Sequence, residues 1–444
     1  MAHDFTHASI TEGVRFTAQV GLPNVVQGLF RRRDAVVSVA GLLRADRLAY
    51  GCTAALVRKH GPDPFWVRVA ADEVLLVHQP DDIRFVLEGS PTPFASDPDT
   101  KRKGMRAFQP TALTLSRGDL WAERRTFAEA ILDTGRPLHR LAEGFAALAV
   151  EEADTLLALE RPATWSDVHT AFLRLTRRVV LGEAAAHDSA LSEQLGELMA
   201  EGNKLPGKPA AGYDDFHALL SQYVDAPGLT ALTGLVAAAP HADLEETDAA
   251  GQLIHWLFAM GDTLPANLMR TLAVLASHPL ALAEVRTELD GKTLTDASTV
   301  AGATYLAGCL QEAMRLWPTT PLLGRVTTDD VRFPGGQVVP AGSQVLIHNL
   351  FNHRDRDRIA FADRFAPEEW ISGTAAQDWS FNFFSHGPQG CPGAGLSIFL
   401  GQAFLGRLLT AAEPTITAGT RLDPSRPLPH ALDLRPLQVT LAPR

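Results

Sequence analysis

One cysteine of this chain lies in a stretch unusually rich in glycine and proline, residues 381–396, which read FNFFSHGPQGCPGAGL. Cys391 directly precedes Pro392, and proline is favoured at the first position of a helix, where its missing N–H leaves no bond unmade. We therefore predict a helix over residues 392–411. Its free N–H groups and its dipole would stabilise a thiolate at Cys391. The stretch is predicted to form a socket for a metal-bound thiolate.

The glycines around the cysteine support this interpretation. Gly387 and Gly390 would let the backbone turn tightly around the sulfur. Gly393 and Gly395 would leave room for a flat ligand to lie against the helix. A buried structural cysteine at a helix start is the alternative, but it does not require so many glycines.

The number of cysteines limits the kind of metal site. Three cysteines, Cys52, Cys309 and Cys391, are too few and too scattered for a disulfide framework, a zinc cluster or an iron–sulfur cluster. A haem iron needs a single protein thiolate, because the porphyrin supplies four other ligands. The sequence therefore favours haem.

The spacing F-x-x-G-x-x-x-C-x-G, formed by Phe384, Gly387, Cys391 and Gly393, resembles the haem-binding loop of the cytochrome P450 family. The resemblance implies haem b with Cys391 as its thiolate ligand. Gln389 stands where the family usually has arginine or histidine, and it can donate a hydrogen bond but brings no charge. The other family motifs are then expected upstream in a fixed order.

The segment CLQEAMRLWP carries Glu312 and Arg315, which share a helix face because they are three residues apart. Alone, such a pair would be interpreted as an ordinary surface ion pair. Here it matches the family's E-x-x-R motif, and the resemblance implies a buried pair that locks the cysteine region together with an arginine of a P-E-R-F segment. In the corresponding FAPEEW, Glu369 replaces that arginine. The candidates for a substitute partner are Arg364, His353 and Arg354.

A long apolar helix is predicted over residues 245–277, and it contains the polar pair Asp262 and Thr263. Pro265 lacks the N–H that would bond to Gly261, so we expect the helix to open at this turn. The pair resembles the A-G-x-D/E-T motif, which implies a catalytic role in delivering protons during dioxygen activation. Met260 replaces the usual glycine. The alternative is a simple kink with Thr263 bonded back to the preceding turn.

Two further positions resemble sites that bind the haem propionates. Trp121 and Arg125 in WAERR match the W-x-x-x-R motif, and Arg325 follows the helix of Glu312. A buried propionate needs cationic or N–H donors, which these side chains provide. Solvation of a lone arginine is the alternative.

Periodicity predicts a mainly α protein with minor β. Helices are expected over residues 138–160, 165–181, 191–202 and 214–224, short strands after Pro318, and a final strand in LQVTLAP. The resemblance implies a single cytochrome P450 domain over residues 1–444, with haem between the long central helix and the cysteine-loop helix. Residues 1–40 have no clear role.

Composition narrows the possible partners. A net charge of −11 disfavours nucleic acid binding, and the few cysteines suit a reducing cytoplasm. The mildly apolar residues 14–30 are too interrupted by polar side chains for a membrane anchor. A basic docking surface for an acidic partner is predicted at Lys101, Arg102, Lys103 and Arg124.

The resemblance implies a haem-thiolate monooxygenase that inserts one oxygen atom from O2 into a small, largely apolar substrate. Electrons would come from a ferredoxin and a ferredoxin reductase, and the bacterial composition suggests secondary-metabolite biosynthesis. The alternatives are a peroxide-driven or C–C/C–O coupling haem enzyme and a catalytically degenerate haem-binding protein. The predicted substrate pocket consists of Phe94, Met105, Phe108, Leu113, Phe258, Ala259, Thr320 and Leu322.

Overall fold

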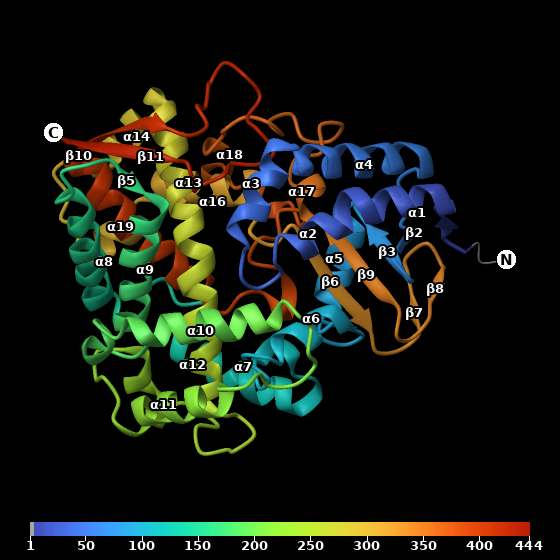
Figure 1. Cartoon of the computed structure of the whole chain (residues 1–444), viewed down its shortest axis with the longest axis horizontal. Coiled ribbons are helices and arrows are strands. Elements are labelled where there is room, and N and C mark those ends of the chain that lie inside the picture. The colour runs from blue at the N-terminus through green and yellow to red at the C-terminus, as the bar shows by residue number, and fades with distance from the viewer. Residues whose placement is uncertain (1–3) are drawn as a thin grey trace.

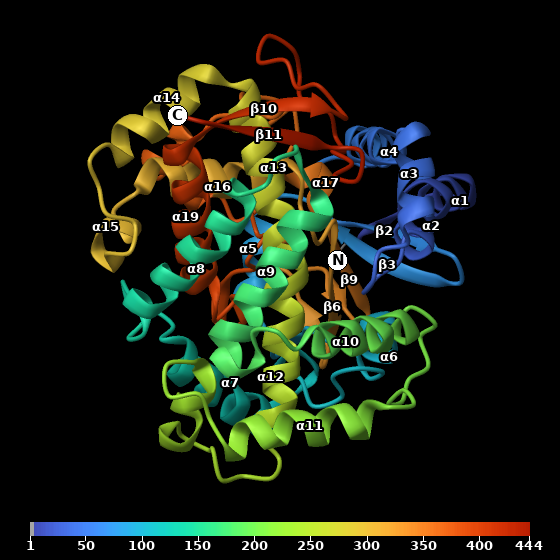
Figure 2. The same ribbon diagram turned by 60° about the vertical axis from the view of Figure 1, so that its left-hand side comes forward.

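The central element of the computed structural model, which describes residues 4–444, is a long helical beam with helices packed on both sides (Figures 1 and 2). A smaller lobe with a six-stranded sheet lies beside this helical body (Figure 1). The mainly α fold with minor β is therefore confirmed. The helices are α1 Ile10–Phe16, α2 Leu22–Val26, α3 Asp34–Leu42, α4 Ala45–His60, α5 Pro80–Glu88, α6 Asp99–Met105, α7 Gly118–Leu132, α8 Ala142–Leu157, α9 Trp165–Val180, α10 Ser189–Gly202, α11 Tyr213–Asp225, α12 Ala249–Phe258, α13 Leu264–Ser277, α14 Pro279–Leu289, α15 Ala297–Ala301, α16 Thr304–Leu316, α17 Asn349–Asn352, α18 Glu368–Ile371 and α19 Ala394–Ala411.

The strands form three sheets. The largest has the order β1-β2-β3-β9-β6-β4, a second has the order β10-β11-β5, and β7 and β8 form a pair. The strands are β1 Thr6–His7, β2 Phe65–Val69, β3 Asp72–Val77, β4 Phe94–Ala95, β5 Ala163–Thr164, β6 Leu322–Thr327, β7 Val331–Arg332, β8 Val338–Val339, β9 Gln344–His348, β10 Ala412–Ala418 and β11 Gln438–Pro443. The predicted strands after Pro318 and in the C-terminal segment are confirmed.

The beam consists of α12 and α13, which are joined by a π-helical turn at Ala259–Thr263. This turn confirms the predicted opening before Pro265, which has no N–H to donate. The beam begins at Ala249 rather than at residue 245, because the Asp248 carboxylate accepts the Gly251 N–H and caps the helix.

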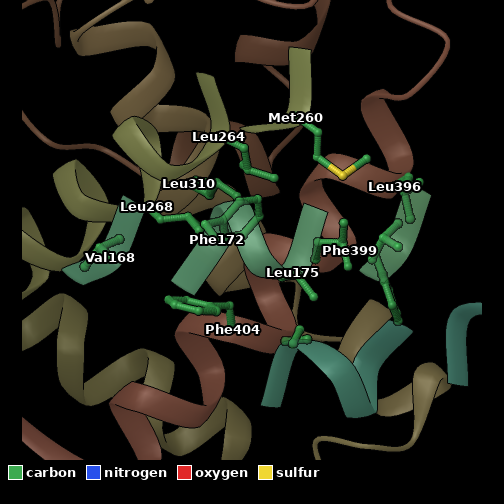
Figure 3. Close-up of a cluster of buried hydrophobic side chains, with 14 of the residues drawn as sticks. Val168, Phe172, Leu175, Met260, Leu264, Leu268, Leu310, Leu396, Phe399 and Phe404 are labelled. Carbon is green, nitrogen blue, oxygen red and sulfur yellow. The ribbon is translucent and has the colours of Figure 1, made fainter. Parts of the chain in front are cut away.

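The core forms where the beam meets α9, α16 and α19. α9 begins with a capping box between Thr164 and Asp167 and buries Phe172 and Leu175 on one face. These side chains meet Leu268 of α13 and Phe404 of α19 in one apolar cluster (Figure 3). The cluster fixes α19, and with it the segment that carries Cys391, relative to the beam.

The prediction that the cysteine helix begins at Pro392 is wrong. α19 begins at Ala394, with Gly393 as its N-cap, because the Ala394 N–H closes a turn onto the Cys391 carbonyl at 3.3 Å. Pro392 lies inside this turn. α19 also has the length and apolar character of a membrane span, as does α12–α13 when taken together with α14 across a bend of 109°, but 61% of α19 is buried within the protein.

His348, at the end of β9, makes stability depend on pH. Its ring is buried, with Nδ1 2.8 Å from the Thr53 hydroxyl, and burial lowers its pKa to about 3. In the unfolded chain the imidazole has a pKa of about 6.5, so below that pH the unfolded state binds a proton that the folded state does not. The contribution of His348 to the free energy of unfolding is therefore fully present above pH ~6.5 and is lost as the pH falls. We expect His348→Gln to lower the slope of the free energy of unfolding against pH by about 1.4 kcal/mol per pH unit between pH ~6 and ~4.

Urea unfolding at several pH values measures this slope. His187→Gln, at an exposed position, is the matched control and should leave it unchanged. An equal slope in wild type and His348→Gln would contradict the prediction.

Candidate active site

A partly open cavity of about 290 Å³ lies between the beam and the segment that precedes α19. It brings together residues far apart in the sequence. The lining includes the predicted site residues Trp121, Arg125, Thr263, Arg325, Phe384, Gln389, Cys391 and Gly393. Gly387 does not line it, although it shapes the loop.

The loop before Cys391 is held by backbone contacts. The Cys391 N–H donates to the Phe384 carbonyl at 2.7 Å. Gly387 has a φ of +65°, and a Cβ there would come within 2.4 Å of the Leu87 carbonyl oxygen, so only glycine fits. The sulfur thus sits at the cavity wall on a rigid turn.

Cys391 is exposed and lines this cavity, and it also lines a second pocket formed with residues 132–139. Burial among protein atoms raises the pKa of its thiol, while the Gly393 N–H and the Arg125 charge oppose this by lowering it. The predicted stabilisation by backbone N–H groups therefore comes from one residue, Gly393, which is the N-cap of α19.

Three cationic side chains line the cavity. Arg125 donates to the Gly390 carbonyl at 2.6 Å and pairs with Glu129. Arg325 is buried and contacts only neutral groups, the Ser90 and Ser385 hydroxyls and the Gly324 carbonyl. Lys101 bonds to the Ser96 carbonyl at 2.9 Å. Burial lowers the pKa of Arg325 to about 10 and that of Lys101 to about 7.

These features fit a haem. Among residues 4–444 no three His, Cys, Asp or Glu side chains gather as a metal site, so a metal bound here must bring most of its own ligands. The two cations without a carboxylate contact, Arg325 and Lys101, match the two propionates of haem b. Gln389 also lines the cavity, and its side-chain NH2 group can donate to a propionate there.

The polar pair of the beam divides between two environments. Thr263 lines the cavity, and its hydroxyl donates to the Ala259 carbonyl at 2.5 Å, as the kink alternative expects. Asp262 is half-buried and lies 3.3 Å from His169 of α9, outside the cavity lining. The two side chains therefore connect the cavity to α9.

Glu312 and Arg315 form a fully buried ion pair at 2.6 Å. None of the predicted substitute side chains completes it: His353 and Arg364 accept from Arg315 through their backbone carbonyls, and Arg354 pairs with Asp363. That prediction is wrong.

Glu312 instead accepts the indole N–H of Trp370 at 2.9 Å and the Ala366 N–H at 3.0 Å. Glu369 is partly exposed. Trp370, its neighbour in sequence, takes the position of the third partner. Sequence reasoning missed it because it looked for a cation, whereas a carboxylate needs only a donor.

The predicted pocket residues separate into two groups. Leu113, Ala259 and Thr320 line the cavity, together with Leu323 and His255, which were not predicted. Met105, Phe108 and Phe258 pack in the core beside it, where the Phe108 and Phe258 ring centroids are 5.2 Å apart. Phe94 and Leu322 pack in clusters on the sheet and are not brought to the cavity.

The predicted basic docking surface is also wrong for two of its members. Lys101 lines the cavity, and Arg124 is buried, donating to the Glu246 carbonyl and the Ser116 hydroxyl. Arg102 and Lys103 are paired with Asp97 and Asp99. The nonpolar residues Gly104 and Met105 lie on the same helix face as Lys101 and are buried, so their spacing could have indicated that Lys101 points inward.

Comparisons with known proteins agree with this geometry. The model of the family described as Cytochrome P450 matches residues 229–439. Cytochrome P450 81F1 of Arabidopsis thaliana is 29% identical over 202 residues, 44% of this chain and 40% of that protein. Cytochrome P450 4c3 of Drosophila melanogaster is 29% identical over 174 residues, 37% of this chain and 32% of that protein. The match thus spans about a third to two fifths of these relatives' length.

The solved structure of a retinoic acid-bound cyanobacterial CYP120A1 superposes with a TM-score of 0.70 at 20% identity, covering 88% of this chain and 93% of that one. The fold therefore extends well beyond the region that the family model matches. Since a lone thiol at a large cavity, a buried E-x-x-R pair and an opened central helix occur together on this fold, the chain belongs to the cytochrome P450 family.

Proposed function

We propose that this protein is a haem-thiolate monooxygenase that inserts one oxygen atom from O2 into a small, largely apolar organic molecule. The observation that carries the proposal is that Cys391 and Thr263 line the same cavity as the buried Arg325 and the partly buried Lys101. Haem held by a cysteine thiolate is the family's cofactor, and when bound it supplies the chemistry of dioxygen activation.

The protein's own residues would hold and orient this cofactor. Cys391 would provide the thiolate ligand of the iron, while Arg325, Lys101 and Arg125 would neutralise the propionates with help from Trp121. Arg325 and Lys101 have no carboxylate contact, so cofactor binding would supply the opposite charge that these two cations lack.

Thr263 and Asp262 would deliver protons during the reaction. Thr263 lines the cavity with its hydroxyl bonded to the Ala259 carbonyl, and Asp262 is reached from solvent through a half-buried contact with His169. A carboxylate between a cavity hydroxyl and a surface imidazole can pass protons inward without opening the cavity to water. The π-helical turn makes room for this exchange.

We expect Asp262→Asn to slow product formation by about 100-fold, because removing a positioned proton donor costs this much in enzymes. Substrate affinity should change little, since Asp262 does not line the cavity. Steady-state rates and spectroscopic substrate titrations measure both effects. Asp188→Asn, a substitution remote from the beam, is the control, and a rate within twofold of wild type for Asp262→Asn would contradict the role.

The function is tested by turnover under ¹⁸O₂ with NAD(P)H, a ferredoxin and a ferredoxin reductase, using a panel of lipophilic compounds. Retinoic acid belongs in the panel, since a structural relative binds it. The expected product carries one labelled oxygen atom. Equal turnover with hydrogen peroxide alone would favour the peroxide-driven alternative, and haem binding without turnover on any compound would favour the degenerate haem-binding protein.

We propose a role in secondary metabolism on the bacterial character of the composition, and a ferredoxin system because members of the family need electron-transfer partners. The coupling alternative keeps the same cofactor and cavity, and it would be recognised by a product that contains no atom of O2.

A further inference from the structure

The exposed large apolar side chains of residues 4–444 are concentrated at the N-terminal end. Fourteen such side chains are found, and ten of them lie between residues 10 and 48. These ten are Ile10, Val14, Leu22, Val25, Val26, Leu29, Val39, Leu42, Leu43 and Leu48. We call them the N-terminal apolar surface.

Two helices of this surface have no core contact that explains their composition. α3 has the sequence DAVVSVAGL, with a single charged residue, yet none of its residues is buried, and the same holds for α2, LPNVV. A helix that is apolar on all sides normally lies in a protein core or a membrane. Leu42 is 84% exposed, so in the isolated protein this apolar surface is in contact with water.

The charge of this segment is opposite to that of the rest of the protein. Residues 1–48 carry six arginines and four acidic residues, a net charge of +2, whereas the whole chain carries −11. All six arginines are exposed, and along the sequence they lie between the apolar residues: Arg15, Arg31, Arg32, Arg33, Arg44 and Arg47. The surface therefore combines apolar and positive groups on a protein that is otherwise acidic.

The surface also lies close to the cavity. α1 to α4 form one lobe beside the six-stranded sheet in both views (Figures 1 and 2). Between α2 and α3, Phe30 packs on Phe108, which in turn packs on Phe258 of the beam, with ring centroids 5.5 and 5.2 Å apart. Phe108 follows α6, whose Lys101 lines the cavity.

We propose that the N-terminal apolar surface docks on an anionic lipid bilayer, with the aliphatic side chains of α2 and α3 at the acyl boundary and the exposed arginines on the phosphate headgroups. Aliphatic side chains interleaved with arginines suit such an interface. The cores of protein interfaces are instead enriched in aromatic residues, and the ten exposed side chains include none. The docking does not depend on the proposed activity.

Co-sedimentation of the full-length haem-loaded protein with vesicles tests this. We expect binding to vesicles of equal parts phosphatidylglycerol and phosphatidylcholine, little binding to phosphatidylcholine alone, and weaker binding at high salt. Leu42→Asp/Leu43→Asp and Arg44→Glu should each lower the partition coefficient at least about tenfold.

Leu280→Asp is the matched control, because Leu280 has the same 84% exposure but lies outside the surface, on α14. It should bind as wild type does. No binding of wild type to the phosphatidylglycerol vesicles, or equal losses in Leu280→Asp and Leu42→Asp/Leu43→Asp, would overturn the proposal. A solution dimer that Leu42→Asp/Leu43→Asp dissociates would assign the surface to a second copy and would also overturn it.

Discussion

Replacing Cys391 by alanine is expected to abolish the long-wavelength Soret band that thiolate-ligated haem shows as its reduced carbon monoxide complex. The sulfur is the one thiol at the cavity wall within residues 4–444, so no other cysteine can replace it as the axial ligand. Haem content should fall as well, since the propionate contacts alone must then retain the cofactor.

The two other cysteines provide matched controls. Cys52 and Cys309 are both buried in apolar clusters, and burial raises the pKa of each thiol, so neither is suited to metal ligation. Cys52→Ala and Cys309→Ala should keep the band at wild-type intensity per haem. A persistent band in Cys391→Ala, or its loss in Cys309→Ala, would refute the assignment of the ligand.

Local chemistry explains which parts of the molecule could be predicted from the sequence. The opening of the beam depends on one proline, and the tight loop depends on a glycine with a backbone conformation that other residues avoid, so both were visible as residue types. The exact start of α19 was not, because the turn at Cys391 depends on a hydrogen bond to Ala394 that competes with the preference of Pro392 for a helix start.

Residues defined by three-dimensional contacts were harder to predict. Lys101 looked like part of a basic surface, since the neighbouring Arg102 and Lys103 are charged, and only the position of α6 against the beam turns it toward the cavity. His169 gave no signal because its partner, Asp262, lies on a helix 93 positions later. Such pairings require the packing of α9 on the beam, which periodicity alone does not specify.

Trp370 shows how a departure from a family motif can be compensated by a neighbouring residue. Its indole N–H bonds to Glu312, and its ring packs against Phe383 with centroids 5.4 Å apart. Phe383 contacts Phe384, whose carbonyl accepts the Cys391 N–H. The buried ion pair is therefore linked to the cysteine loop through a short run of aromatic contacts. A substitution that disrupts the pair should therefore also weaken haem binding.

We accordingly expect Glu312→Ala to lower the free energy of unfolding by about 3–5 kcal/mol, the cost of leaving a buried charge without its partner. Arg315 is fully buried, and with Glu312 gone its Nε loses the only acceptor it has in the described structure. Its Nη1 and Nη2 keep carbonyl acceptors in residues 353–364, which are neutral and cannot compensate the charge. The haem content of the purified variant should fall with its stability.

Urea unfolding of the haem-loaded protein measures this loss, and a series of variants separates its causes. Trp370→Phe removes one hydrogen bond to Glu312 but keeps the ring, so it should cost only about 1–3 kcal/mol. Glu88→Gln breaks the exposed pair with Arg84, both side chains about half exposed, and should cost under about 0.5 kcal/mol. If Glu312→Ala cost no more than Glu88→Gln, the pair would not be the lock of the cysteine region. Glu312→Ala should cost more than Trp370→Phe because it leaves the buried charge of Arg315 uncompensated, whereas Trp370→Phe removes one hydrogen bond. Both should cost more than Glu88→Gln, because water can replace the lost partner only at the exposed pair.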